Sequence, residues 1–356
     1  MAEKKYQQVY TYILQFIHDN SLRAGDRLPT ERELEEALGV SVSSVHRAMN
    51  RLIAEDRVYK IQGSGSYVKG PPVKESAPGG IFLCPLILAD NSDELWSLES
   101  IQGAESFCKS KDIYLTIHNS NLSTDEEGRI LENLYRKNIL HAIISPNSVD
   151  RTAYQPFVDK GMRLVFLDYC PREWEYDMVE TNNYLAARQM CAYLFEKGHR
   201  RIGVFFVEPL YRSSGRLRCE GVRDYLREQG LEVVPDWFVL DEGYEERIAR
   251  LMRSDRRPTA FVGLNDGAAN ALILLLNRLG YRVPEDVSVT GFDGLGLRRG
   301  NTPLLTGIRQ PFYQMGYEAA RLLYRLLNEG EGPGITRLLL PAAIQEGETV
   351  RALAGN

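Results

Sequence analysis

The hydrophobic residues near the start of the chain recur with the spacing of amphipathic helices. Val9, Ile13, Phe16 and Ile17 form an apolar stripe at helical spacing, which predicts a first helix from about Tyr6 to Asn20. A short second helix is expected to begin at Thr30, because Glu33 three residues later completes the pattern of a capping box, and to end at Gly39. A third helix follows, with Ser41 or Ser43 as its cap, and its buried stripe is Val45, Met49 and Leu52.

Beyond Asp56 the pattern changes to the alternation of strands. The segments RVYKI and SYV read as two short strands around a tight turn at Gln62-Gly-Ser-Gly65. Three helices followed by a hairpin predict a winged helix-turn-helix domain over residues 1–70. In such a domain the third helix enters the major groove of double-stranded DNA.

The stretch LPTERELEEALGVSVSSVHRAMNRLIAEDRVYKIQGSGSYV resembles the winged-helix domain of the GntR repressor family. The resemblance implies DNA contacts from the second and third helices and from the wing tip, namely Arg32, Ser41, Ser43, Ser44, His46, Arg47, Gln62, Gly63 and Ser64. Family members usually carry arginine where this chain has Val42 and again where it has His46, so their operator sequences are not inherited. The alternative for each residue taken singly is structural, as a helix cap, a solvated side chain or a turn.

The segment GPPVKESAPGG predicts a linker, over residues 71–80, because prolines and glycines replace apolar residues. From Ile81 onward short apolar runs alternate with amphipathic helices, and the alternation restarts after Glu180. The predicted strands are IFLCPLIL, IYLTIH, HAIIS, RLVFL, RIGVFFV, TAFVG and VSVTGF, with helices over residues 183–197, 217–229 and 266–279 among them. This is the pattern of parallel sheets with helices on both faces, in two lobes.

Polar residues follow several of these strands, at the sheet edge where ligands bind in α/β proteins. They are Asp90, Asp168, the pair Asn265 and Asp266, and Asp293. Carboxylates and amides that converge on one site suit a polyhydroxylated ligand, and Trp96 could pack on the apolar face of a sugar. Asp and Asn are also ordinary helix caps at such junctions, which is the alternative for each of them.

The segments GHRRIGVFF, SSGRLRCEGVRDYL, RPTAFVGLNDGAANAL, RVPEDVSVTGFDG and PLLTGIRQPFYQMGYEAARLL resemble the effector domain of the LacI/GalR repressors and of periplasmic sugar-binding proteins. The resemblance implies an α/β fold with two Rossmann-like lobes of the type I periplasmic-binding-protein kind, joined by three crossovers around the effector. It assigns residues 81–178 and 311–332 to one lobe, and residues 182–308 and 333–356 to the other. By motif, Arg218, Asn265, Asp293 and Gln310 would hold the ligand.

Composition and motif searches exclude several classes of protein. The net charge of −5 offers no global basic field, no apolar run reaches the length of a membrane span, and MAEKKYQQVY has no secretory pattern. The cysteines are odd in number and widely spaced, which favours a reduced, cytoplasmic protein. No Walker A loop, HExxH pair or GxSxG elbow is present, so we expect neither an enzyme nor a cofactor or metal.

The prediction is a cytoplasmic, sugar-responsive repressor of carbohydrate-utilisation genes that binds a palindromic operator as a homodimer. The joining of the two domains resembles the arabinose-repressor type of regulator. Three alternatives stay open: a regulator with a purine-type corepressor, a constitutive DNA-binding protein whose second domain only dimerises, and a sugar-binding or sugar-modifying protein whose winged helix contacts other proteins.

Overall fold

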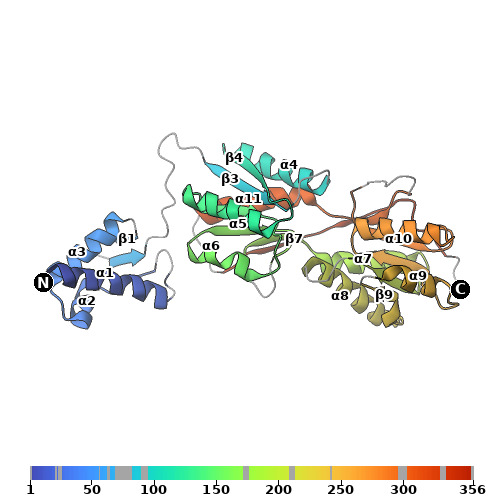
Figure 1. The fold of residues 1–356 in the computed structure, drawn as a ribbon, viewed down its shortest axis with the longest axis horizontal. Coiled ribbons are helices and arrows are strands. Elements are labelled where there is room, and N and C mark those ends of the chain that lie inside the picture. Colours follow the sequence, from blue (N-terminus) through green and yellow to red (C-terminus); the bar gives the residue numbers. More distant parts are fainter. Residues whose placement is uncertain are drawn as a thin grey trace. The chain divides into compact units, whose positions relative to one another are not determined.

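The computed structural model describes residues 2–20, 22, 26–55, 57–61, 65–68, 82–89, 95–170, 176–207, 213–240, 243–295, 303–328 and 334–353. The chain divides into two compact units, Met1–Ile81 and Phe82–Asn356 (Figure 1). The predicted linker at residues 71–80 lies outside the described residues.

The first unit is a three-helix domain with a two-stranded hairpin. Its elements are α1 (Ala2–Asp19), α2 (Glu31–Leu38), α3 (Val42–Ala54), β1 (Val58–Ile61) and β2 (Gly65–Val68). The predicted apolar stripes meet in one core, in which Val9, Val45 and Leu52 are fully buried. The strands pair antiparallel, as predicted for a wing.

Both ends of α2 have the geometry that the sequence predicts. The Thr30 backbone N–H donates to Glu33 Oε2 at 2.7 Å and the Glu33 N–H donates to Thr30 Oγ1 at 3.2 Å, which is a complete capping box. Gly39 ends the helix in the left-handed region at φ 60°, where a side chain would be strained. The turn between α2 and α3 is therefore fixed by local sequence.

In the second unit, the first of two six-stranded sheets is parallel throughout, in the order β13-β7-β6-β5-β3-β4. Helices α4 (Leu95–Ser110) and α11 (Phe312–Asn328) pack on one face with Leu86 and Leu88, whereas α5 (Thr124–Arg136) and α6 (Gln155–Asp159) cover Ile87 on the other. This alternation along one strand is why the run LCPLIL is apolar on both sides. The strands are β3 (Leu83–Leu88), β4 (Tyr114–Asn119), β5 (His141–Ile144), β6 (Arg163–Leu167), β7 (Met178–Thr181) and β13 (Arg337–Leu340).

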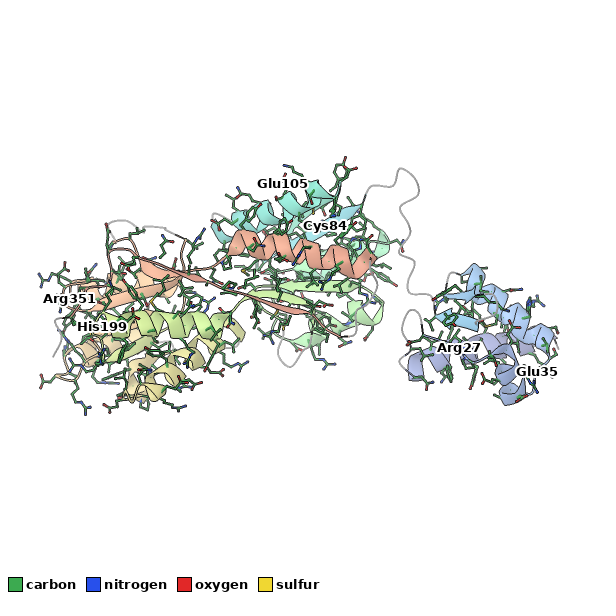
Figure 2. The ribbon with its side chains drawn as sticks, turned by 180° about the vertical axis from the view of Figure 1, so that it is seen from behind. Arg27, Glu35, Cys84, Glu105, His199 and Arg351 are labelled. Atoms are coloured by element: carbon green, nitrogen blue, oxygen red, sulfur yellow. The ribbon has the colours of Figure 1, made fainter. Side chains whose placement is uncertain are left out.

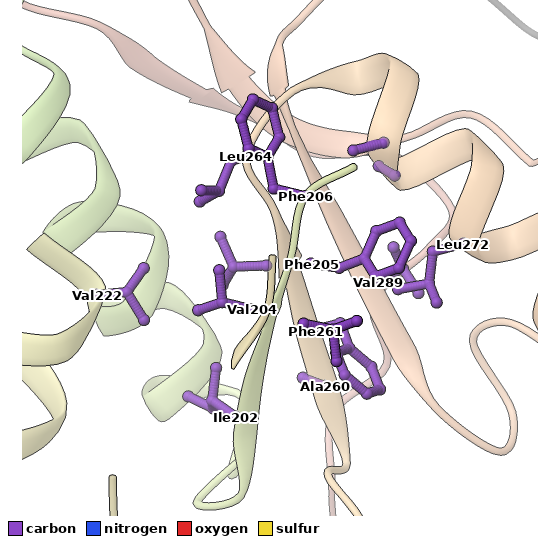
Figure 3. Close-up of a cluster of buried hydrophobic side chains, with 14 of the residues drawn as sticks. Ile202, Val204, Phe205, Phe206, Val222, Ala260, Phe261, Leu264, Leu272 and Val289 are labelled. Carbon is purple, nitrogen blue, oxygen red and sulfur yellow. The ribbon is translucent and has the colours of Figure 1, made fainter. Parts of the chain in front are cut away.

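The second sheet has the order β14-β12-β11-β10-β8-β9, and only β14 runs antiparallel to its neighbour. Its helices are α7 (Asn183–Glu196), α8 (Ser213–Glu228), α9 (Tyr244–Met252) and α10 (Asp266–Arg278). Figure 3 shows Val222 of α8 on one side of the central strands and Leu272 of α10 on the other. The strands are β8 (Ile202–Phe205), β9 (Phe238–Val239), β10 (Ala260–Gly263), β11 (Ser288–Asp293), β12 (Thr306–Arg309) and β14 (Ala343–Gln345).

The chain crosses between the sheets three times, between β7 and α7, between β12 and α11, and between β13 and β14. One predicted boundary is wrong. The sequence predicts that the second lobe resumes at residue 333, but β13 pairs with β7 in the first sheet, with Leu340 opposite Thr181, and only β14 joins the second sheet. The run RLLL carries no signal for which sheet it joins, because that choice depends on where the chain comes to lie after α11.

Two buried ionisable side chains form hydrogen bonds with segments outside their own elements. Glu127 of α5 accepts from the Tyr154 hydroxyl at 2.5 Å and from the Asn147 N–H at 2.9 Å, and burial raises the pKa of Glu127 to about 7. In the second lobe the ring of His199 lies 3.1 Å from the Arg351 carbonyl oxygen, near the C-terminal end of the chain (Figure 2). Burial lowers the pKa of His199 to about 4.

All five cysteines are buried, and none of them is joined to another by a disulfide. Among the described helices, none combines the length and the apolar character that crossing a membrane requires.

Candidate functional site

Helix α3 presents a polar face to solvent. Ser43, His46 and Arg47 are exposed on it, whereas Val45 and Met49 face the core. The sequence therefore places three of the predicted DNA-contacting residues where a ligand could reach them. The predicted contacts at the wing tip, Gln62, Gly63 and Ser64, lie outside the described residues.

Ser44 does not fit its predicted role. Its side chain is buried, because it shares the inward face of α3 with Val45 and Ala48, so a direct DNA contact from Ser44 is not supported. Ser41 occupies the N-cap position, but its side chain makes no cap hydrogen bond to the backbone. Its hydroxyl instead lies 3.0 Å from Ser43 Oγ and 3.1 Å from Ser44 Oγ.

Two arginines of α3 rest on tyrosine rings of α1. The guanidinium of Arg47 lies 4.7 Å from the ring centroid of Tyr6, and that of Arg51 lies 4.6 Å from the ring centroid of Tyr10. Arg51 also donates to the Tyr6 hydroxyl at 3.3 Å and to Glu55 at 2.8 Å. These contacts hold the arginines in defined orientations while leaving them exposed.

The predicted contact residue of α2, Arg32, is almost fully solvated. Its side chain is 86% exposed and pairs with Glu36 one turn later at 3.2 Å. A pair of this kind contributes little to stability, so moving Arg32 from Glu36 to a phosphate would cost little.

In the second unit Arg218 of α8 is the centre of a buried polar cluster. Its Nε donates to Asn183 Oδ1 at 2.8 Å, its Nη1 donates to the Leu264 carbonyl at 2.6 Å, and its guanidinium lies 3.8 Å from the Phe292 ring centroid. The same Nη1 is 3.7 Å from Asp293 Oδ1. Arg218 is 5% exposed, so its orientation is fixed by these partners.

Asp293 and Gln310 form the second part of the cluster. Gln310 Nε2 donates to Asp293 Oδ1 at 2.7 Å, and the Thr181 hydroxyl donates to Gln310 Oε1 at 2.7 Å. Burial and the nearby Asp266 carboxylate raise the pKa of Asp293 above its usual range, against the opposing effect of Arg218. The chain of hydrogen bonds joins the ends of β7 and β11 to the segment that leaves β12.

Asn265 has the capping role that the sequence leaves open. It precedes α10, and its Oδ1 accepts from the Ala268 N–H at 2.6 Å. The next residue, Asp266, is buried, and its Oδ2 accepts from the Leu295 N–H at 3.0 Å. A Cβ at Gly291 would lie 2.3 Å from Asp266 Oδ1, so that strand position requires glycine.

The other predicted effector residues belong to the first lobe. Asp168 follows β6 with φ 75°, and its N–H donates to the Val179 carbonyl at 3.0 Å. Trp96 lies at the start of α4, partly buried, with its ring 6.4 Å from that of Phe312. Asp90 lies outside the described residues.

The structure brings the predicted residues Arg218, Asp293 and Gln310 together with the strand-end residue Asp266, and it adds Thr181 and Asn183, which the sequence did not indicate. Asp266 carried a signal, as the second residue of the Asn-Asp pair that ends a strand. Thr181 and Asn183 carried none beyond their position where the βα alternation restarts, because their role depends on chain crossings. Within the described ranges, no group of three or more His, Cys, Asp and Glu side chains lies close enough to hold a metal ion.

The arrangement suits an uncharged, hydroxyl-rich ligand. A guanidinium, carboxylates and amides gathered at the carboxyl ends of strands present both donors and acceptors. Neighbouring sugar hydroxyls need this combination, because each hydroxyl both donates and accepts.

Comparison with protein families gives one match in each of the two units. Residues 5–68 match the family described as bacterial regulatory proteins, gntR family, and residues 191–350 match the periplasmic binding protein-like domain.

Individual relatives match across both units. The arabinose metabolism transcriptional repressor of Geobacillus stearothermophilus is 28% identical over 348 residues, which cover 92% of this chain and 93% of the relative. The ribose operon repressor of Escherichia coli strain K12 is 24% identical over 315 residues, 85% of this chain and 94% of the relative. Among solved structures, a LacI family transcriptional regulator from Enterococcus faecium with bound ribose superposes with a TM-score of 0.61 at 22% identity, covering 76% of this chain and all of that chain.

Proposed function

We propose that this chain is a sugar-responsive transcriptional repressor, because residues 5–68 match the gntR family of bacterial regulatory proteins and residues 191–350 match the periplasmic binding protein-like domain. It acts in the cytoplasm as a homodimer on a palindromic operator, and it controls genes for carbohydrate utilisation. The observation that carries the proposal is the presence, on one chain, of an exposed α3 face and of a polar cluster at strand ends in which the partly exposed Asp293 contacts the buried Arg218 and Gln310.

The DNA-binding half of the proposal rests on α3. A winged helix-turn-helix reads one half-site, so two copies related by a two-fold axis read a palindrome. Ser43, His46 and Arg47 face solvent for base and phosphate contacts, and Arg32 adds an exposed charge from α2. The net charge of −5 means that these local groups, not a global field, must attract the DNA.

The effector half rests on the polar cluster of the second lobe. We assign Arg218, Asp293 and Gln310 to the hydroxyls of a sugar, with Asn265 beside them. Asp168 and Trp96 would contribute from the first lobe, the tryptophan by packing on the apolar face of the sugar. No bond is made or broken in this scheme, so the chain has no catalytic step.

The crossovers provide a route from ligand to DNA. Gln310 lies in one crossover and accepts from Thr181 at the edge of another, while the Asn182 N–H donates to the Leu340 carbonyl of the third at 2.8 Å. A sugar that engages Asp293 and Gln310 would bias the angle between the lobes and thereby the geometry of the dimer. Such coupling is typically about 1–3 kcal/mol and is reciprocal, so operator DNA must weaken sugar binding by the same factor.

The test is a thermal-shift screen of the full chain against pentoses, hexoses, sugar phosphates and disaccharides, followed by operator binding with each hit. A ligand at ~100 times its Kd stabilises by about 2.7 kcal/mol, which raises the melting temperature by a few degrees. We expect one sugar to stabilise the protein and to release DNA, and Asp293→Ala to lose both responses.

Two outcomes would count against the proposal. If purines stabilise the protein and strengthen DNA binding, the chain is a corepressor-type regulator. If no compound acts and Asp293→Ala represses as well as the parent, the second unit serves dimerisation only.

A further inference from the structure

The exposed face of α3 consists of two columns of side chains with different surroundings. Residues four apart lie one above the other on a helix, so Ser43, Arg47 and Arg51 form one column, and Val42, His46 and Asn50 form the other. The first column leans on α1, where Tyr6 and Tyr10 hold its arginines. In the second column, His46 and Asn50 are hydrogen-bonded to each other.

Val42 is anomalous on this face. It is the first residue of α3, and its side chain is 53% exposed. Among the described residues of the first unit, no other large apolar side chain is as exposed to solvent. Val42 does not pack in the core of this unit, because the buried side of α3 consists of residues such as Val45 and Met49.

His46 is oriented for donation. The Asn50 amide lies 3.1 Å from His46 Nδ1, and since that amide nitrogen can only donate, the neutral ring carries its proton on Nε2. The Nε2–H is thus a single donor one helical turn beyond Val42. In the major groove, guanine offers two adjacent acceptors, N7 and O6, to such a donor.

We propose that Val42 and His46 are specificity-determining residues, with Val42 selecting thymine through its C5 methyl group and His46 selecting guanine through its Nε2–H. Asn50 is a positioning residue that fixes the His46 tautomer. This inference rests on the proposed function, and it follows from general groove chemistry: residues at the N-terminus of a recognition helix meet base edges, and the thymine methyl is the apolar group displayed in the major groove.

The experiment begins with selection of a binding site by the full chain from a random duplex library. Each thymine of the enriched half-site is then replaced by deoxyuridine, which removes only the methyl group. We expect one position at which this weakens binding about fourfold in one half-site and about fifteenfold in both, the loss expected for one buried methyl contact. In Val42→Ala the same replacement should have no effect.

The second arm replaces guanine by 7-deazaguanine, which removes the N7 acceptor. One position should lose about fivefold in the parent, the effect of one neutral hydrogen bond, and nothing in His46→Ala. Asn50→Ala should weaken this discrimination without changing the response to deoxyuridine. Because all three side chains are exposed, thermal unfolding should match the parent in each variant.

The outcomes separate the two proposals. Failure of the folded parent to enrich any sequence would overturn the proposed function and this assignment together. Enrichment of a site that is insensitive to methyl removal, or equally sensitive in Val42→Ala, would overturn the role of Val42 and leave the repressor proposal standing. Equal sensitivity to 7-deazaguanine in the parent and in His46→Ala would overturn the role of His46.

Discussion

Replacing Arg218 by alanine tests how the buried polar cluster contributes to stability. The change removes two charged-donor hydrogen bonds, at 2.8 Å to Asn183 and 2.6 Å to the Leu264 carbonyl, and the stacking on Phe292. It also leaves the Asp293 carboxylate without the cation 3.7 Å away. Breaking a buried pair by removing one partner costs about 3–5 kcal/mol.

The matched control lies two residues earlier on the same helix. Arg216 pairs with Glu220 at 3.1 Å, but its side chain is 58% exposed. Exposed pairs at this spacing are worth about 0.3–0.5 kcal/mol. Arg216→Ala therefore removes the same side chain type from α8 without the burial, and its unfolding should nearly match that of the parent.

The assay is urea unfolding of the full chain followed by tryptophan fluorescence. The three tryptophans are Trp96, Trp174 and Trp237, so the signal reports only the unit Phe82–Asn356. A loss of 3 kcal/mol moves the midpoint by about 1 M urea for a slope near 3 kcal/mol per M, at the upper end for small proteins. Equal midpoints for Arg218→Ala and Arg216→Ala would refute the reasoning, because the cluster would then contribute no more than a surface pair.

Three further predictions address packing, pH and DNA. Gly103→Ala should destabilise the first lobe by more than about 2 kcal/mol, because the new Cβ would lie 1.8 Å from the Tyr313 carbonyl oxygen of α11. Gly128→Ala on α5 is the control: its Cβ meets no atom within 4 Å, so it should stabilise by about 0.5–1 kcal/mol. Thermal unfolding distinguishes the two variants. Burial raises the folded-state pKa of Glu127 to about 7, so the folded protein keeps a proton that the unfolded chain loses above about pH 4.5. The free energy of unfolding should therefore fall by roughly 3 kcal/mol as the pH rises from 4.5 to 7. Unfolding measurements at about pH 5–8 test this, and a Glu127→Gln variant with the same pH slope as the parent would contradict it. Arg47→Ala should weaken operator binding about tenfold. In a titration from 50 to 200 mM salt, the slope of the log binding constant against log salt concentration should also become shallower, by the amount expected for about one lost phosphate contact per half-site. An unchanged slope would rule out a phosphate contact.

The sequence by itself determined the local structure of this protein. The Thr30 and Glu33 capping box, the Gly39 helix end and the apolar stripe of α3 depend on contacts within a few residues, so spacing alone predicts them. The βα alternation and the strand-end residues Asp293 and Asn265 follow for the same reason. Motif resemblance then added Arg218 and Gln310, which no periodicity would have selected.

Only the tertiary structure decided which of these residues meet. Thr181 bonds Gln310 across 129 positions of sequence, and β13 joins the first sheet rather than the second. The burial of Ser44, beside the exposed Ser43, likewise depends on which face of α3 the core covers. Contacts between chain crossings leave no local trace, because the partners are chosen by how two sheets and their helices pack, and that free energy is spread over the whole core.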